Sequence, residues 1–378
     1  MSTVGCWRRA ARDWIVTASV GLLLAGCAGS GRPKPEPLAP LTPTMASGPA
    51  WTQQIEGIQF PLAIAVAGST VTLAGNDGTV LALEAASGQA VWRANVGAKL
   101  SAGVGSDGRF AAVVTRSGEL IVLENGQVKW RKLLATRVTT APLVAGERVF
   151  VVGVDRAVQA FDALDGRKLW ALRRPGDPLT LAQSGVLSAF KDTLVVGQGP
   201  RMAGVDPLRG DVRWEVAIGS PRGANEIERL ADLVGPSARV GNLVCARSFQ
   251  AAVGCVDAER GALAWSKNIG GIDALAADAQ FVFAADASDR ITAWSIKGDV
   301  AWTSDKLLYR SLGAPVSIGK AVVFGAEDGM LHFLSRDTGE ALLRVPTDGS
   351  PPAAQPVVVD GVLLVVTRKG GLFAFRPQ

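Results

Sequence analysis

The stretch LEAASGQAVW, residues 83–92, places a tryptophan four residues after a glycine, and the same spacing returns along the chain. The six pairs are Gly88 and Trp92, Gly126 and Trp130, Gly166 and Trp170, Gly210 and Trp214, Gly261 and Trp265, and Gly298 and Trp302. In a seventh unit Gly339 is followed at this offset by Leu343. Together with Trp51, whose following residues resemble those after the other tryptophans, these anchor positions lie 37 to 51 residues apart. A repeat of about 40 residues with short strands is typical of a β-propeller blade.

Within each unit, short apolar runs alternate with turn residues. Residues 101–134 read SAGVGSDG, RFAAVVTRSG, ELIVLENG and QVKWRKLL, four runs bounded by Gly, Asp or Asn. Alternation of this kind predicts strands, and no helical period is long enough to compete. The chain is therefore predicted to be all-β, with four-stranded antiparallel blades.

The two ends of the repeat region predict how the propeller closes. After Leu343 only three strand-like runs remain, AAQPVVV, GVLLVVTRK and GLFAFRP, whereas the run at Trp51 has no inner strands before it. We expect the N-terminal strand to complete the last blade, because this hides the edges of both segments and gives eight blades. The tryptophans then lie in outer strands, where each indole can pack against the adjacent blade.

The N-terminal region has the features of a lipoprotein leader. Arg8, Arg9 and Arg12 precede an apolar run that ends in Leu-Ala-Gly before Cys27. This run is too short to span a bilayer as a helix. We expect residues 1–26 to be a signal peptide, Cys27 to carry lipid, and the proline-rich residues 27–48 to form an extended tether. Residues 49–378 would then be the propeller.

The sequence carries few groups suited to catalysis. Glu84, Asp162, Asp206 and Asp257 each stand four residues before a repeat glycine, which is the position of a turn former rather than of a catalytic pair. His332 is the only histidine, so histidine-based zinc sites and Ser-His-Asp chemistry are disfavoured. No Gly-rich phosphate loop joins a strand to a helix. We expect no catalytic residue, no metal and no cofactor, and the formal charge of +5, which falls to +3 without the leader, gives little reason to expect nucleic acid.

Cys245 and Cys255 flank a predicted hairpin in VCARSFQAAVGCV. A three-residue loop at residues 249–251 would place them opposite each other, within reach of a disulfide in an oxidising compartment. A two-residue loop would shift the register and turn them to different faces.

The unit ALEAASGQAVW, residues 82–92, and similar units ending at Trp170 and Trp265 resemble the repeats of PQQ-dependent quinoprotein dehydrogenases. That resemblance implies an eight-bladed fold. Enzymes of that family are longer chains that use calcium ligands, a catalytic aspartate and commonly a Cys-Cys pair. No Cys-Cys occurs in this sequence, and we find no place for such a pocket. A PQQ-dependent quinoprotein oxidoreductase is the alternative function.

A closer resemblance, over leader, tether and all blades, is to the BamB family, the lipoproteins of the outer-membrane β-barrel assembly (BAM) complex. It is carried by NEIERLAD at residues 225–232, LLYR at residues 307–310 and GMLHF at residues 329–333. The first of these lies in the longest step between anchors, from Trp214 to Trp265, which generic repeats do not require. The resemblance implies a lipid-anchored, non-enzymatic scaffold at the outer membrane that faces the periplasm, binds BamA and assists nascent outer-membrane proteins.

In BamB proteins, loops between consecutive blades contact the periplasmic POTRA region of BamA. The resemblance carries this role to Leu179 and Leu181 in the loop at residues 178–183 and to Asp232 in the later loop. Ala182 stands where an arginine is typical of the family, and Val234 where a second aspartate is typical. We therefore expect the two leucines to provide more of the contact than charges do.

Glu226 and Arg229 in the later loop are further candidates for the partner contact. Because they are three residues apart, they could instead form a local ion pair that holds the shape of the loop. Leu179 and Leu181 could likewise fold back over the blade edge.

Overall fold

The structure, a computed structural model, describes residues 33–174, 179–221 and 223–378. These ranges contain β-strands and no helix. The chain divides into two compact units, Met1–Pro35 and Glu36–Gln378. The predicted signal peptide and Cys27 lie outside the described residues. Among those that are described, no helix is long and apolar enough to cross a membrane.

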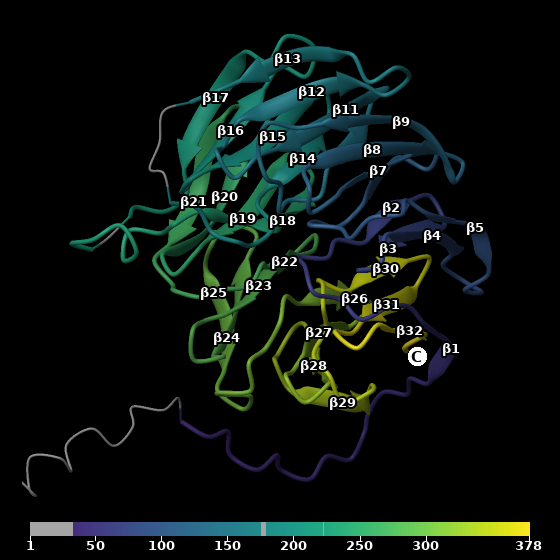
Figure 1. The fold of residues 1–378 in the computed structure, drawn as a ribbon. Coiled ribbons are helices and arrows are strands. Elements are labelled where there is room, and N and C mark those ends of the chain that lie inside the picture. Colours follow the sequence, from purple (N-terminus) through teal and green to yellow (C-terminus); the bar gives the residue numbers. More distant parts are fainter. Residues whose placement is uncertain (1–32, 175–178, 222) are drawn as a thin grey trace, which may run out of the picture. The chain divides into compact units, whose positions relative to one another are not determined.

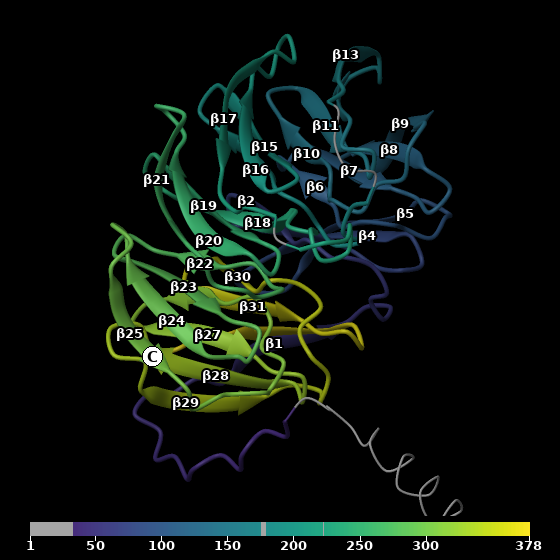
Figure 2. The same ribbon diagram turned by 90° about the vertical axis from the view of Figure 1, so that its left-hand side faces the viewer.

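The second unit consists of eight four-stranded antiparallel sheets, each a blade (Figures 1 and 2). Blades 1 and 2 contain, from the innermost strand outward, β2 (Ala65–Ala67), β3 (Thr70–Ala74), β4 (Thr79–Glu84) and β5 (Ala90–Asn95), then β6 (Gly105–Ser106), β7 (Phe110–Val114), β8 (Glu119–Glu124) and β9 (Gln127–Leu133). Blades 3 and 4 contain β10 (Leu143–Ala145), β11 (Arg148–Val152), β12 (Val158–Asp162) and β13 (Lys168–Leu172), then β14 (Leu187–Phe190), β15 (Thr193–Gln198), β16 (Arg201–Val205) and β17 (Val212–Ala217).

The second half of the unit repeats this order. Blades 5 and 6 contain β18 (Leu233–Val240), β19 (Leu243–Ser248), β20 (Ala252–Asp257) and β21 (Ala262–Lys267), then β22 (Ala276–Ala277), β23 (Phe281–Ala285), β24 (Ile291–Ser295) and β25 (Val300–Ser304). Blade 7 contains β26 (Val316–Ile318), β27 (Ala321–Gly325), β28 (Met330–Ser335) and β29 (Ala341–Pro346). Blade 8 contains β30 (Val357–Val359), β31 (Val362–Val366), β32 (Gly371–Phe375) and, as its outer strand, β1 (Pro49–Gln54).

The predicted closure is confirmed. Strand β1 pairs antiparallel with β32, and Trp51 lies opposite Ala374. Val71 of blade 1 and Leu364 of blade 8 belong to one buried cluster, so the first and last blades pack against each other. The ring therefore closes through apolar side chains, and the backbone edge of β32 is paired rather than open.

The core lies between neighbouring blades, because each sheet is apolar on both faces of its two middle strands. Val114 and Val122 of blade 2, for example, pack in one cluster with Val149 and Val151 of blade 3. All five residues of β7 are buried, whereas in β9 two of the seven residues are half-buried and the other five are exposed. Each blade depends on its two neighbours for most of the apolar area that it buries.

The repeated tryptophans dock one blade onto the next, as predicted. The indole N–H of Trp130 in blade 2 donates to the carbonyl oxygen of Ala163 in the outer turn of blade 3, at 2.8 Å. The same bond joins Trp51 to Ala85, Trp170 to Pro207, Trp265 to Ile296, and Trp302 to Arg336, at 2.9 to 3.0 Å. Each of these five indoles is thus fixed both by packing and by its one hydrogen-bond donor.

The repeat glycine receives the tryptophan of the preceding blade, not its own. A Cβ atom on Gly210 would come within 2.7 Å of the Trp170 ring, and equivalent contacts of 2.5 to 3.1 Å would occur at the other six repeat glycines. Gly210 also has a φ of +82°, which a glycine adopts without strain. The Gly-x-x-x-Trp spacing therefore records two different interfaces, one on each side of a blade.

At the interface between blades 7 and 8, Leu343 stands in place of tryptophan. The outer strands of blade 8 are not joined by a hairpin turn, because β32 and β1 come from opposite ends of the unit. In place of that turn, the backbone N–H of Gln378 donates to the carbonyl oxygen of Ala46 at 2.8 Å, and Met45 packs against the buried cluster that contains Leu343.

Part of the predicted tether belongs to the folded unit. We expected an extended tether over residues 27–48, but the unit begins at Glu36. The Thr44 N–H donates to the Leu342 carbonyl at 3.0 Å, Arg344 donates to the Ala39 carbonyl at 2.8 Å, and Leu38 packs against Leu307 and Leu312. Figure 1 shows this purple segment passing below β28 and β29.

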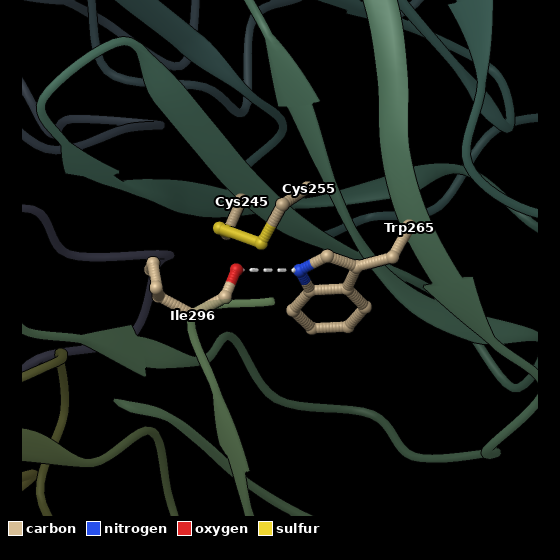
Figure 3. The surroundings of a disulfide bond; sticks show 4 residues. All are labelled: Cys245, Cys255, Trp265 and Ile296. Atoms are coloured by element: carbon tan, nitrogen blue, oxygen red, sulfur yellow. Dashed lines mark hydrogen bonds between the residues drawn. A yellow bond between two sulfur atoms is a disulfide. The ribbon is translucent and has the colours of Figure 1, made fainter. Parts of the chain in front are cut away.

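Cys245 and Cys255 are directly opposed on β19 and β20 and form a disulfide in the structure (Figure 3). The last pair before the turn is Ser248 with Ala252, so the loop has three residues, as in the first of the two registers considered. Both sulfur atoms lie beside Trp265, whose N–H donates to the Ile296 carbonyl at 3.0 Å.

Candidate partner-binding face

Two connections between blades carry the residues for which a partner contact was predicted. The first runs from β13 to β14 and contains Leu179 and Leu181; its Pro178 lies outside the described residues. Leu179 is 36% exposed and Leu181 is half-buried. The second connection, from β17 to β18, contains Glu226, Arg229 and Asp232.

Arg156 and Asp232 join these two connections. The Arg156 Nη2 atom donates to Asp232 Oδ1 at 2.9 Å and to the Leu179 carbonyl at 3.2 Å. The other carboxylate oxygen, Oδ2, accepts the backbone N–H of Leu181 at 2.9 Å. Asp232 and Arg156 together therefore fix the backbone on both sides of Thr180. Its side chain is only 15% exposed, so its direct role is to shape the face, not to present a free acid.

Arg156 was missed from the sequence. It lies in the turn between β11 and β12, with a φ of +60°, where equivalent turns of other blades have Gly78, Gly118 or Gly329. A residue with a Cβ atom is strained in this conformation, and such strain persists where the surroundings hold it. The replacement of a turn glycine by arginine was the signal that could have identified it.

The tip of the second connection is held by its own backbone and by Glu228. The Glu228 Oε2 atom accepts the Ala224 N–H at 2.8 Å, and Asn225 Oδ1 accepts the Glu228 N–H at 2.9 Å. No ion pair joins Glu226 to Arg229 among the described residues of this loop. Both side chains are exposed, so the alternative of a local ion pair is not what the structure contains.

Ile227, between these two charged residues, is 73% exposed. The turn that carries it is closed by a hydrogen bond from the Arg229 N–H to the Asn225 carbonyl at 3.1 Å. The second connection therefore presents one apolar and two charged side chains on a turn with a fixed backbone.

The two positions that depart from the family pattern lie further toward the centre of the same face. Ala182 is exposed and Val234 is buried, and both line the mouth of the central channel, a cavity of about 340 Å³. A smaller cavity of about 60 Å³ beside it is lined by Leu181, Arg156 and Asp232. The leucine loop and the channel mouth are therefore parts of one continuous surface.

Three of the four acids predicted to be turn formers hold their turns through a side-chain oxygen, whereas the Glu84 carboxylate accepts the Ser69 hydroxyl at 3.2 Å. Asp206 Oδ1 accepts the backbone N–H groups of Leu208 and Arg209 at 2.8 and 3.0 Å, and Asp162 and Asp257 accept in the same way. His332 is buried in β28, and this burial, followed by the charge of Arg344, lowers its pKa to about 4. The imidazole is therefore neutral at pH 7. Within the described ranges, no three His, Cys, Asp or Glu residues lie together as metal ligands would.

Comparison with known proteins shows which family the chain is similar to. A family model described as "Outer membrane protein assembly factor BamB" matches residues 76–304. The BamB of Burkholderia pseudomallei is 34% identical over 371 residues, which cover 96% of this chain and 97% of that protein. The BamB of Escherichia coli is 26% identical over 347 residues, 88% of each chain.

Two solved structures show the same fold. The crystal structure of BamB from Moraxella catarrhalis superposes with a TM-score of 0.75 at 23% identity, covering 86% of this chain and all of the other. The quinohemoprotein alcohol dehydrogenase of Comamonas testosteroni gives a TM-score of 0.65 at 15% identity, covering 87% of this chain and 76% of that one. At these identities, the similarities concern architecture alone.

Proposed function

This chain belongs to the BamB family of outer membrane protein assembly factors, and we propose that it is a non-enzymatic scaffold of the BAM complex. In this proposal, lipid on Cys27 holds the protein at the outer membrane, on the periplasmic side. The face that carries Leu179, Leu181 and the loop of Glu226 and Arg229 binds the POTRA region of BamA, and the bound scaffold assists nascent outer-membrane proteins.

The observation that carries the proposal is the bridge from Arg156 to Asp232. It holds two inter-blade loops in one arrangement and keeps Leu179 partly exposed at their junction. A surface that is ordered before its partner arrives loses less conformational entropy on binding. An exposed leucine on such a surface gains apolar burial when a partner covers it.

The proposal predicts that Leu179→Asp together with Leu181→Asp lowers the amount of BamA that co-purifies from detergent-solubilised envelopes by about tenfold, because two apolar contacts are replaced by charges. The matched control is Leu208→Asp with Leu263→Asp, two leucines that are 61% and 46% exposed on the outer strands and turns of blades 4 and 5. Circular dichroism and melting temperature check that both variants fold. Normal recovery of BamA with the first pair would reject this face.

A further inference from the structure

The mouth of the central channel has a wall built from six blades. The loops that enter the innermost strands of blades 1, 4, 5, 6, 7 and 8 line its cavity of about 340 Å³. Gln355 ties three of these loops together, because its Nε2 atom donates to the Leu275 carbonyl at 3.0 Å and to the Pro315 carbonyl at 2.6 Å. The cavity is therefore preformed, and its volume is at the lower end of the range for ligand pockets.

Two charged side chains line this mouth, Asp273 from blade 6 and Arg368 from blade 8. Arg368 is exposed, whereas Asp273 is half-buried and lines the cavity. Within the described part of the chain, the carboxylate of Asp273 has no hydrogen-bond or ion-pair partner. Burial raises the pKa of Asp273 to about 6. A carboxylate in this position gains from any donor that enters the cavity.

Arg247 and Arg368 favour the charged form of Asp273, whereas Asp289 opposes it. Arg247 is fully buried and donates to the Ala285 carbonyl at 2.6 Å and to the Ile269 carbonyl at 3.4 Å. Asp286 accepts backbone N–H groups of its own turn, and Asp289 accepts those of Ser311 and Leu312. At the mouth, Asp273 is the carboxylate that accepts no hydrogen bond from the described residues, and the positive charges of Arg247 and Arg368 act on it only at longer range.

The mouth also continues into the candidate partner-binding face. Gln183, Ser184 and Val234 line both the channel mouth and the small cavity beside Leu181 and Asp232. A protein segment bound at the leucine loop is therefore close enough to extend a side chain toward the opening of the channel. Phe60, Pro61 and Ala353 give the cavity an apolar wall along which the methylene groups of a long side chain can pack.

We propose that the channel mouth receives one lysine or arginine side chain of the bound partner protein, and that Asp273 is the residue that pairs with it. This inference rests on the proposed function, since it needs a partner on this face. The partner's side chain would supply the hydrogen-bond donor that the loops lining the mouth do not provide to Asp273.

The test measures the affinity of the soluble periplasmic domains of BamA for the full-length folded chain and three variants. Asp273→Asn removes the receiving charge while keeping the shape of the side chain, and we expect binding to weaken about tenfold at pH 7.5. Arg368→Gln removes the competing cation, and we expect equal or tighter binding. Asp299→Asn, a matched change at an exposed acid of the β24–β25 turn, should leave affinity unchanged.

A pH series gives a second readout. Wild-type binding should weaken as pH falls through about 6, because Asp273 becomes protonated, and this change should be absent from Asp273→Asn. Weaker binding by Arg368→Gln with none lost by Asp273→Asn would mean an anionic guest and would overturn the inference. Equal affinity of wild type and Asp273→Asn at every pH would do the same.

These failures are distinct from failure of the proposed function. If Leu179→Asp with Leu181→Asp abolishes binding while Asp273→Asn does not change it, the docking face is supported and only the role of Asp273 is rejected. If the wild-type chain does not bind BamA at all, both fall.

Discussion

Except between blades 7 and 8, each interface between blades is formed by the tryptophan of one repeat and the glycine of the next. The tryptophan supplies area and an N–H donor, and the next glycine supplies the space in which the ring lies. Because the two residues meet at one interface but belong to different repeats, a change in either should destabilise the packing of the same pair of blades.

Gly210→Ala should lower the free energy of unfolding by about 3 kcal/mol, since the new methyl group meets Trp170 and the backbone keeps a positive φ. Gly241→Ala is the matched control. It has a φ of +57° with no atom within 4 Å of the new Cβ, so only the backbone strain of about 1 kcal/mol applies. Denaturant unfolding measures both values. Equal losses at the two sites would show that the indole does not need the glycine.

His332 makes stability depend on pH. Its pKa is about 4 in the folded chain and 6.5 when unperturbed, so between these values only the unfolded state binds the proton. The free energy of unfolding therefore falls as pH drops from 6.5 to 4, by about 3 kcal/mol from this residue. Below pH 4 both states are protonated and this loss stops growing.

His332→Leu should remove that dependence. At pH 8 we expect its stability to lie within about 1.5 kcal/mol of wild type, because the volume is similar. At pH 4.5 the variant should be the more stable of the two. Unfolding curves of both proteins at the two pH values decide this, and parallel losses on acidification would refute a buried neutral imidazole.

One charged pair with little exposure, Arg156 and Asp232, holds two of the connections between blades together. The side chains of Arg156 and Asp232 are 17% and 15% exposed, whereas those of Arg290 and Asp305 are 53% and 54% exposed. Exposed ion pairs contribute little, while loss of one member of a sheltered pair leaves the other charge poorly solvated. The bridge should therefore control the shape of the face.

A double-mutant cycle with Arg156→Gln and Asp232→Asn should give a coupling energy of about 1 to 3 kcal/mol in unfolding experiments. The same cycle at Arg290 and Asp305 should give a clearly smaller coupling energy, because solvent screens this exposed pair. Each single change at the bridge should also weaken BamA binding, whereas the control pair should not affect it. Full retention of BamA binding by both bridge variants would show that loop shape is not set by this pair.

The sequence predicted the elements better than their contacts. Periodic apolar runs and turn glycines were sufficient for the four strands of each blade, because both signals are local. Asp232 was found from a family resemblance, but its structural role was not, since its partner Arg156 is 76 residues away. Glu228, which holds the second loop, was overlooked between Glu226 and Arg229 because spacing alone does not separate three neighbouring charges.

At the scale of the whole molecule, counting repeats was enough to predict eight blades and the strand exchange at the closure. The start of the folded unit was not predicted, because residues 36–48 carry the composition of a tether. Leu38 and Met45 pack against blades 6, 7 and 8 only because the ring brings those surfaces together. The channel mouth likewise depends on loops from six blades and has no local signature in the sequence.

The most direct test of the account is photo-cross-linking in intact cells from a benzophenone side chain at position 179, compared with one at position 208. Leu208 is 61% exposed and Leu179 is 36% exposed, so if exposure alone decided cross-linking, position 208 would give more adduct. The account predicts an adduct with BamA from position 179 and none from position 208. An adduct from position 208 with none from position 179 would contradict it.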